Sequence, residues 1–482
     1  MSNQGKPSRR SGFVLSAVSA FCMMTALTGA AMASPESGVK GDPQPELQPF
    51  SIGPATSPGS VALEPNGSLI AAYDIKAGKG KTLVCLLNRG ERKCSQKVVL
   101  TPLSADDTFG TPQVFVTSAN HVIVLQDACC DNNAAGGDVV YSSTDGGRSF
   151  SAPVRVGDLG VSSAALVGND LLFISGNDGS GAQVQSVQVK PSLESNGPVV
   201  TAQAKEAFDV GISNDHGGVL VASDFLGKTG YTTYVEYANP KASPFTTAGS
   251  FAKVATFSGE QLIGVSGRAL LTEETGGKNW VRVRLFNGTK FGAPHNVPGT
   301  SGGGPEWFAV DQDPSGAVHV FSERGLAHPI YDLLEYTTSN GTKWDAPVDL
   351  GDAIQNNGFA AALDSHGSGL VLGTDPAWGY PVLGTQSVSF NLKLSNIKKG
   401  KSTIGSGKGN PAATGRLITL QVQGKSGNWF KVATTHEKSG GSFSFTIKGK
   451  SDGTFRYRAV AADLAGYLQF GYSNAKSLRV TG

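Results

Sequence analysis

The chain is poor in charge, and after its N-terminus it has no long apolar run. Charged residues make up 16% of 482 positions and aromatic residues 8%. A membrane-spanning helix needs ~20 consecutive apolar residues, so we expect no membrane span beyond the N-terminus. The sequence also contains no His-Glu-x-x-His pair, no Gly-rich phosphate loop and no Gly-x-Ser-x-Gly elbow. These absences argue against zinc-peptidase, P-loop and α/β-hydrolase chemistry.

Glycine, by contrast, is abundant, with 64 residues of this type. Each glycine in a helix interior costs about 1 kcal/mol relative to alanine, which argues against a protein built of long helices. Many short strands joined by tight turns accommodate glycine better, and the length is ample for a large core. The composition therefore predicts a large all-β protein.

The first 33 residues have the three parts of a secretory signal peptide. Lys6, Arg9 and Arg10 precede an apolar run over 13–27, and Ala31-Met32-Ala33 is a small-x-small cleavage site. An uncleaved membrane anchor is the alternative. We expect cleavage before residue 34, a linker over 34–45, and a secreted protein that is extracellular or associated with the cell wall.

Cysteine is scarce, and the first of the five, Cys22, lies in the signal segment. An even number of cysteines in an oxidising compartment predicts two disulfides. Cys85 and Cys94 flank a turn at 88–90, whereas Cys129 and Cys130 are adjacent. The favoured pairs are Cys85–Cys94 and Cys129–Cys130, and the alternative joins the first two cysteines to the vicinal pair.

The small net charge hides a division between two parts of the chain. Residues 391–482 hold 15 Lys and Arg against three acids, whereas residues 34–390 hold 22 against 35. A basic domain attracts polyanions with a strength that depends on salt. The alternatives are attraction between the two domains and a purely solubilising role.

A repeated pattern predicts the fold of the acidic part. It consists of an apolar strand, a polar turn, a second apolar strand and then an acid, and the copies are 47 to 53 residues apart. Such a period is typical of a β-propeller with four strands per blade. We therefore expect a seven-bladed propeller over 46–390, or a six-bladed one if the copy at 262–273 is irregular. The copies cover residues 61–74, 114–127, 164–178, 210–224, 262–273, 308–323 and 359–375.

The segment 47–53 resembles the outer strand of a blade but has no hairpin partner before it. The seventh repeat, in turn, is followed by only one further strand, which we place around 382–390. We expect the N-terminal segment to complete the last blade, because such pairing closes the open edge of the ring.

One octapeptide carries a family resemblance. Ser143-Thr144-Asp145-Gly146-Gly147-Arg148-Ser149-Phe150 matches the Asp-box, S/T-x-D-x-G-x-x-W/F, and resembles the repeat of sialidase-type (BNR) propellers. The resemblance implies structural roles for Ser143, Asp145, Gly147 and Phe150. The family's catalytic set does not carry over, since the chain has no Arg-Ile-Pro motif and no recognisable arginine triad.

The C-terminal part resembles a second kind of module. Alternating strands over 416–422, 429–435, 442–448, 454–461 and 477–480 are similar to the Ig/fibronectin-III-like domains of secreted Gram-positive proteins. The resemblance covers 391–482 and implies a β-sandwich with Trp429, Phe443, Phe445 and Tyr457 in its core. Lys398-Lys399-Gly400-Lys401 is either a surface-binding patch or a solvated linker.

The candidate ligand face is the one where the second strand of each blade ends. A ring of acids there would bind a cation or cationic groups, or supply an acid/base pair for glycoside chemistry, although an Asp after a strand often only caps a loop. Asp127, Asp131 and Asp138 offer oxygen ligands to Ca²⁺, but their spacing matches no EF-hand loop, and we predict no metal or other cofactor. The face comprises the acids Asp74, Asp127, Asp178, Asp224, Glu273, Glu323 and Asp375 together with Cys129, Cys130, Arg324, His328, Trp378 and Tyr380.

These observations favour a secreted, sialidase-like propeller that binds a glycan or a protein near the cell envelope, held there by the basic domain. The alternative is a glycoside hydrolase or lyase that uses the carboxylates of the candidate ligand face, and a third reading is a scaffold without a small ligand. We expect a monomer and no nucleic-acid partner.

Overall fold

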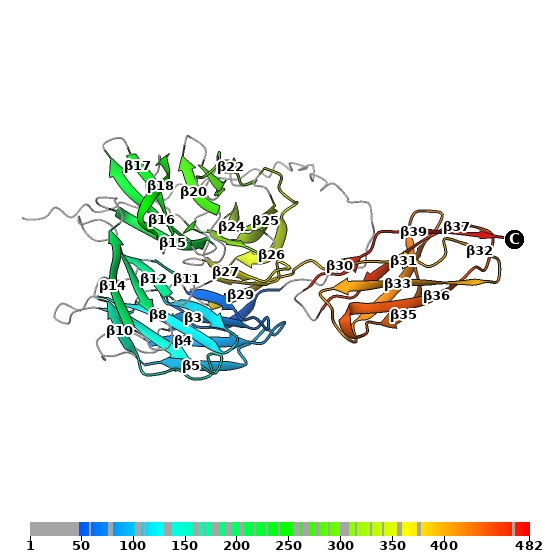
Figure 1. Ribbon diagram of the computed structural model, residues 1–482, viewed down its shortest axis with the longest axis horizontal. Helices are drawn as coiled ribbons and strands as arrows, with labels where there is room; N and C mark the ends of the chain where they lie inside the picture. Colours follow the sequence, from blue (N-terminus) through cyan, green and yellow to red (C-terminus); the bar gives the residue numbers. More distant parts are fainter. Residues whose placement is uncertain are drawn as a thin grey trace, which may run out of the picture. The chain divides into compact units, whose positions relative to one another are not determined.

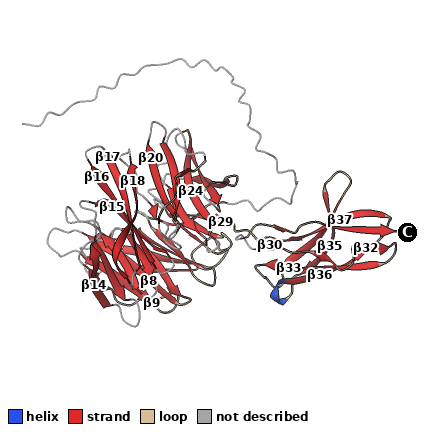
Figure 2. Cartoon of the chain, turned by 45° about the horizontal axis from the view of Figure 1, so that its top comes forward, coloured by secondary structure: helices blue, strands red, loops and turns tan. Residues whose placement is uncertain are grey.

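The computed structural model of the chain describes most of residues 48–482, and nearly all of its elements are strands (Figure 2). In the described part the one helix is a 3-10 turn, η1, at Ser439–Gly441, and none is long and apolar enough to cross a membrane. For residues 167–281 the description covers the backbone alone. The segments outside the description are 1–47, 57–58, 76–80, 102–107, 110, 130–136, 158–162, 168–169, 176–182, 189–193, 202–206, 216–217, 228–229, 240–241, 254–260, 263–268, 276–278, 288–289, 299–307, 314–315, 328–329, 340–341, 354–358, 374–376 and 465–467.

The described strands between residues 50 and 382 form seven antiparallel sheets, coloured from blue to yellow in Figure 1. Within a sheet, strands that follow one another in the chain are hydrogen-bonded neighbours, except that the short strand β6 of the second sheet pairs with β8 rather than with β7. The first sheet is β2 (Ser60–Leu63), β3 (Leu69–Ile75), β4 (Lys81–Leu87) and β5 (Gln96–Leu100). The second sheet is β6 (Thr108–Phe109), β7 (Gln113–Ser118), β8 (His121–Cys129), β9 (Gly137–Ser143) and β10 (Val154–Gly157).

The next three sheets follow the same order. The third is β11 (Ser163–Val167), β12 (Asp170–Ser175), β13 (Gln183–Gln188) and β14 (Glu194–Thr201). The fourth is β15 (Ala207–Asp215), β16 (Gly218–Gly227), β17 (Gly230–Asn239) and β18 (Ala242–Lys253). The fifth is β19 (Gln261–Leu262), β20 (Ala269–Thr275), β21 (Asn279–Leu285) and β22 (His295–Asn296). The copy at 262–273 thus forms a sheet of its own.

The last two sheets bring the two ends of the repeated region together. The sixth is β23 (Phe308–Gln312), β24 (Val318–Ala327), β25 (Ile330–Thr338) and β26 (Val348–Ala353). The seventh is β27 (Phe359–Leu363), β28 (Gly369–Gly373), β29 (Ala377–Val382) and, from the N-terminus, β1 (Phe50–Gly53). Phe50 pairs with Gly379 and Ser51 with Trp378, which confirms the expected N-terminal clasp. The strand expected around 382–390 was misplaced, because the third strand of this sheet ends at 382.

Neighbouring sheets pack through the apolar faces of their strands. One cluster joins Ile70 and Val84 of the first sheet to Val122 and Val124 of the second. Others join the first sheet to the seventh, the sixth to the seventh, and the fifth to the sixth. The first strands touch in a cycle, from β2 through β7, β11, β15, β19, β23 and β27 back to β2. This arrangement of four-stranded sheets is that of a β-propeller.

The remaining strands form sheets of their own beyond residue 386. One group has β33 (Ser402–Asn410) paired with β30 (Ser387–Val388), β31 (Asn391–Leu392) and β36 (Ser442–Lys448). The other contains β32 (Asn396–Lys398), β39 (Lys476–Thr481), β37 (Gly453–Ala461), β34 (Leu417–Gln423), β35 (Trp429–His436) and β38 (Gly471–Tyr472). Strand pairing therefore assigns residues 387–390 to the C-terminal sheets rather than to the propeller.

A core lies between these two groups of C-terminal strands. Phe443, Phe445 and Tyr457 are buried in it as expected. Trp429 is not in this core, because its ring stacks on the guanidinium of Arg458, 4.4 Å away. Position 429 pairs with 423 on a strand whose alternation turns this side chain away from the core.

The clasp strand is held by side chains of the first sheet as well as by its backbone pairing. The carbonyl oxygen of Ile52 accepts hydrogen bonds from Lys97 Nζ at 3.0 Å and from Tyr73 Oη at 3.4 Å. Burial raises the pKa of Tyr73 to about 12. The Ile52 side chain is 2% exposed and lies in the core between the first and seventh sheets.

We predict that Ile52→Ala lowers the free energy of unfolding by about 2–4 kcal/mol, as large-to-small changes in well-packed cores do. Chemical denaturation followed by tryptophan fluorescence measures the change. Ser51→Ala is the matched control, because Ser51 is exposed on the same strand and its loss should cost no more than about 0.5 kcal/mol. Equal effects of the two substitutions would contradict the role given to the clasp.

Candidate functional site

The acids of the candidate ligand face lie inside strands wherever the structure describes them, which corrects the expectation that they follow the strands. The second strand of each sheet continues past the acid because its pairing with the third strand continues. Glu323, for example, pairs with Leu333 in mid-strand. Of the set, Asp74, Asp127, Asp224, Glu273 and Glu323 lie in strands β3, β8, β16, β20 and β24, and Asp178 and Asp375 lie outside the described residues.

Asp74 is engaged in packing between two sheets rather than open to a ligand. Its carboxylate accepts a hydrogen bond of 2.6 Å from the hydroxyl of Thr82, and its residue is 8% exposed. The Gln126 amide of the second sheet contacts the same hydroxyl. Asp74 and Glu323, whose residue is 6% exposed, are thus withdrawn from solvent.

The two aromatic residues expected in a loop of this face lie in strand β29. Tyr380 is fully buried and packs edge-on against Phe359 with ring centroids 6.2 Å apart. Trp378 is half-buried, and its buried indole nitrogen has no hydrogen-bond partner among the described residues. Arg324 lies in β24 and Cys129 in β8, and the structure describes only the backbone of both. His328 and Cys130 lie outside the described residues.

The Cys85–Cys94 disulfide is present as predicted. It joins the last residues of β4 to the segment that leads into β5. The pairing of Cys129 with Cys130 stays a prediction because Cys130 and the side chain of Cys129 lie outside the described residues.

The Asp-box turn between β9 and β10 is tied by its own side chains. Asp145 accepts hydrogen bonds from the backbone and the hydroxyl of Ser149, at 2.9 and 2.6 Å. The Ser143 hydroxyl accepts the backbone N–H of Gly147 at 2.8 Å, and Phe150 packs against the core between the first two sheets. Burial of Asp145 acts in the opposite sense, but the hydrogen bonds from Ser149 and Ser143 lower its pKa to about 2.

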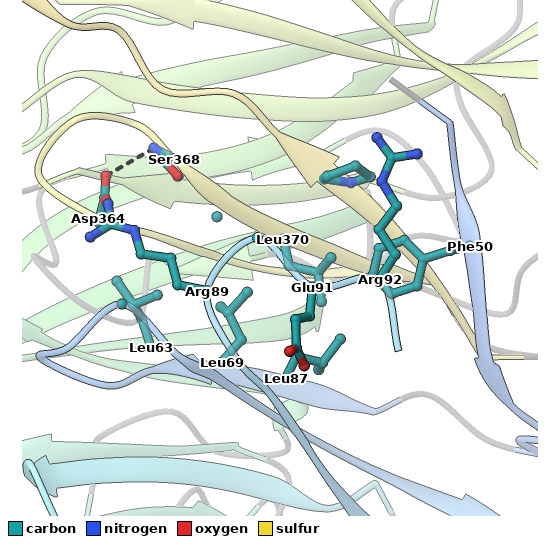
Figure 3. A pocket seen from close by; sticks show the side chains of 14 residues that line it. Phe50, Leu63, Leu69, Leu87, Arg89, Glu91, Arg92, Asp364, Ser368 and Leu370 are labelled. Carbon is teal, nitrogen blue, oxygen red and sulfur yellow. Dashed lines mark hydrogen bonds and ion pairs between the residues drawn. The ribbon is translucent and has the colours of Figure 1, made fainter. Parts of the chain in front are cut away.

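A small cavity of about 30 Å³, open to solvent, lies between the first and seventh sheets (Figure 3). Its walls come from the turns that follow β2, β4 and β27, so it lies at the opposite end of the strands from the candidate ligand face. Phe50 of the clasp strand and Leu370 belong to its apolar lining. The other apolar lining residues are Leu63, Leu69, Leu87 and Pro381.

The turn after β4 contributes Arg89, Glu91 and Arg92 to the lining of this cavity, and Asp364 is its other charged residue. Arg89 reaches across to the seventh sheet and forms an ion pair of 2.6 Å with Asp364. Arg92 points the other way, beside Phe50 (Figure 3). Arg92 is exposed and forms no ion pair or hydrogen bond within the part of the chain that the structure describes. The cavity thus combines an apolar lining with the Glu91 carboxylate and with the Arg92 guanidinium, which has no partner among the described residues.

The turn at 364–367, which lines the cavity, is one of three similar turns that the sequence analysis did not recognise. Glu64, Asp313 and Asp364 each directly follow the first strand of the acid's own hairpin, and a glycine lies three residues after each acid. In each turn the acid's N–H donates to the carbonyl four residues on, at 2.8, 3.0 and 2.7 Å. The glycines have φ of +85°, +94° and +70°, a region that residues with a Cβ rarely enter. The pattern acid-x-x-Gly is visible in the sequence at 64–67, 313–316 and 364–367.

These turn acids meet basic groups, two of them from the adjoining sheet. Asp364 pairs with Arg89, and Glu64 faces Arg148 of the Asp-box turn. Burial raises the pKa of Glu64, while a hydrogen bond from Asn66 and the charge of Arg148 oppose that shift. Arg89 and Arg148 both lie in turns that join the third and fourth strands of a sheet. The seventh sheet takes its fourth strand from the N-terminus and has no such turn, so none lies beside Asp313.

Asp313 instead contributes to a buried cluster around His319. Glu335 lies 2.7 Å from Nδ1 of His319, and Asp313 lies 3.4 Å from its Nε2. Burial disfavours the imidazolium, but the hydrogen bonds to Asp313 and Glu335 outweigh it and raise the pKa of His319 to about 9. Nearby, Asp311 accepts the N–H of Leu363 from the seventh sheet at 2.9 Å, and burial raises its pKa to about 7.

No known protein family matches the chain, and no curated protein is similar to it in sequence. Among solved structures, a Trypanosoma rangeli sialidase in complex with the inhibitor DANA is 10% identical, with a TM-score of 0.39 and coverage of 87% of this chain and 88% of that one. The catalytic domain of a GH62 alpha-L-arabinofuranosidase from Coprinopsis cinerea is 12% identical, with a TM-score of 0.30 and coverage of 51% and 93%. A prolyl endopeptidase is 11% identical, with a TM-score of 0.43, and this chain covers 54% of its length. Likeness at this level carries no functional argument.

The described residues also include no group of three His, Cys, Asp or Glu side chains that would hold a metal ion. The proposed Ca²⁺ ligand Asp131 lies outside the description, so that alternative stays untested.

His319 should make stability fall as pH rises. Because its folded pKa of about 9 exceeds the ordinary 6.5, its contribution is complete below pH 6.5 and is lost as pH rises through 9. We predict that the free energy of unfolding falls by roughly 2–3 kcal/mol between pH 7 and 10. Denaturant titrations at fixed pH measure this slope.

His319→Gln should flatten that slope, whereas His436→Gln, at an exposed position of β35, should leave it unchanged. The interval begins at pH 7 because Asp311, with its raised pKa, contributes its own pH dependence below that value. An undiminished slope in His319→Gln would assign the pH dependence to other groups.

Proposed function

We propose that this chain is a secreted, sialidase-like β-propeller that binds a glycan or a protein near the cell envelope. In this proposal the seven sheets are seven blades of one ring. The cycle of contacts among the first strands and the clasp between β1 and β29 support it. The signal-like pattern of residues 1–33 and the Cys85–Cys94 disulfide support export, because disulfides persist mainly outside the cytosol.

The C-terminal sheets are, in this proposal, an Ig/fibronectin-III-like domain. Two groups of strands enclose the core that contains Phe443, Phe445 and Tyr457. The strands expected from the sequence occur at β34, β35, β36, β37 and β39. A sandwich of this kind commonly serves as an accessory or attachment module, and its function depends on its surface.

The cavity between the first and seventh sheets is the observation that carries the binding function. Arg92, which is exposed and has no partner within the described part of the chain, lies beside an apolar lining that includes Phe50 and Leu370. Guanidinium groups form charge-assisted hydrogen bonds with carboxylates, and aromatic and aliphatic surfaces pack on the apolar faces of sugars. The arrangement fits a ligand that presents a carboxylate next to an apolar face, such as an acidic sugar at the end of a glycan.

Glycoside hydrolysis or elimination is the alternative. It would need two accessible carboxylates at a suitable separation. Among the acids of the candidate ligand face, the structure describes the side chains of Asp74 and Glu323, and both are buried. Their burial favours binding over catalysis.

We predict that Arg92→Gln weakens binding of the mature protein to short acidic oligosaccharides at least tenfold, since a hydrogen bond to a charged group is worth about 1.5–3 kcal/mol. An oligosaccharide array ranks the ligands and titration calorimetry gives the dissociation constants. Lys93→Gln is the matched control, because Lys93 is an exposed cation on the same turn that does not line the cavity.

Parallel assays with fluorogenic glycosides test the alternative. Turnover that disappears in Asp224→Asn or Glu323→Gln would replace the binding function with hydrolysis. Equal binding by Arg92→Gln and the native chain would remove the cavity from the proposal.

A further inference from the structure

Five exposed lysines gather at one end of the C-terminal sheets. Lys398, Lys399 and Lys401 belong to the turn between β32 and β33, and Lys448 and Lys450 flank the start of the segment between β36 and β37. We call these five residues the lysine cluster. The sequence shows only its first three members as a group, because the other two lie almost fifty residues further on.

Backbone hydrogen bonds fix the two halves of the lysine cluster side by side. The N–H of Gly400 donates to the carbonyl of Gly449 at 2.8 Å, and the N–H of Gly449 donates to the carbonyl of Lys401 at 2.9 Å. Ser402 is paired with Lys448 in the adjoining strands. The stretch is therefore a tied turn, and the expectation of a solvated linker is wrong.

Close packing beneath the turns holds this geometry. A Cβ on Gly449 would lie 2.9 Å from Val480 and 3.1 Å from Ile397, both of which are core residues. The N–H of Lys399 also donates to the carbonyl of Thr481 at 2.8 Å. Hydrogen bonds, strand pairing and packing all hold this backbone in place. The Cα atoms of the five lysines are therefore close together in a defined arrangement.

The charge of the lysine cluster is not neutralised by the described residues. None of the five ammonium groups forms an ion pair or a hydrogen bond within the described part of the chain. Of the three acids in 391–482, Glu437 is buried against Arg416, and Asp463 lies beside the 464–468 bridge. Asp452, in the turn after Lys450, is the one that lies in this region. At physiological salt, where charges interact over about 8 Å, local charge density outweighs the net charge of a domain.

We propose that the lysine cluster is a binding site for a linear polyanion, of the kind formed by the acidic glycopolymers of a cell envelope. The inference rests on the proposed location of the protein at the envelope. Lysine ammonium groups are strongly hydrated point charges without the planar geometry that selects one anion. A surface of five such groups therefore matches a polymer with regularly repeated negative charges better than a single small ligand.

The test measures binding of the full mature chain to immobilised polygalacturonate. Fully methyl-esterified pectin, which has the same backbone without the charges, is the reference polymer. Replacement of all five lysines of the cluster by Gln should weaken binding at least tenfold. It should also reduce the slope of log affinity against log salt, since fewer counterions are released on binding.

The matched control removes the same amount of charge from scattered positions. Lys408, Lys425, Lys431, Lys438 and Lys476 are all exposed in the same domain, and their joint replacement by Gln should change affinity no more than twofold. Lys→Arg at the five cluster positions should retain binding. The single change Lys450→Glu, at an exposed turn residue, tests the cluster even if the fivefold Gln variant folds poorly, and should weaken binding about threefold or more.

Equal losses in the cluster and scattered variants would overturn the inference, because they would show that net charge alone is responsible. Equal binding to the esterified polymer, or no binding by the native chain, would also overturn it. The cluster variant should keep the binding of short acidic oligosaccharides that depends on Arg92. Failure of the cavity proposal is therefore distinguishable from failure of this one.

Discussion

The pairing of β1 with β29 is the interaction on which the first and seventh sheets depend. It supplies the seventh sheet with its fourth strand, and it places Phe50 in the wall of the cavity. It also removes the turn that would otherwise join a third to a fourth strand in that sheet. The other described junctions at this end of the sheets use that turn to present an arginine to a neighbouring acid, as Arg89 does to Asp364. Where the turn is missing, Asp313 faces a buried histidine instead.

The sequence predicts the sheets well and the sites poorly, and the two outcomes have different physical origins. Alternating apolar strands and glycine turns are local signals, so the repeats, the clasp and the Cys85–Cys94 disulfide were predictable. The position of an acid relative to a strand end is set by pairing with the next strand. Asp74 accordingly lies inside β3 and bonds to Thr82. The turn acids at 64, 313 and 364 were predictable in principle, since acid-x-x-Gly recurs, but their partners come from other sheets.

The distribution of charge was likewise predictable only in part from the sequence. A count along the chain separates an acidic part from a basic one, but it cannot say which cations act together. Lys448 lies beside Lys401 only because Gly449 accepts a backbone hydrogen bond from Gly400 and donates one to Lys401. Tertiary structure thus converts a diffuse excess of lysine into one dense surface. The cavity shows the same principle, since Arg92 gains its apolar neighbours from the seventh sheet, far away in the sequence.

The clasp has a consequence for how the protein assembles. Phe50 and its partner Gly379 are more than three hundred residues apart in the chain, so their contact closes a much longer loop than any hairpin contact does. The strand that is synthesised first is the last to find its partner. Until then the seventh sheet carries an open edge, the kind of surface that recruits other chains. The ring can therefore be completed only after residues 377–382 have been synthesised as well.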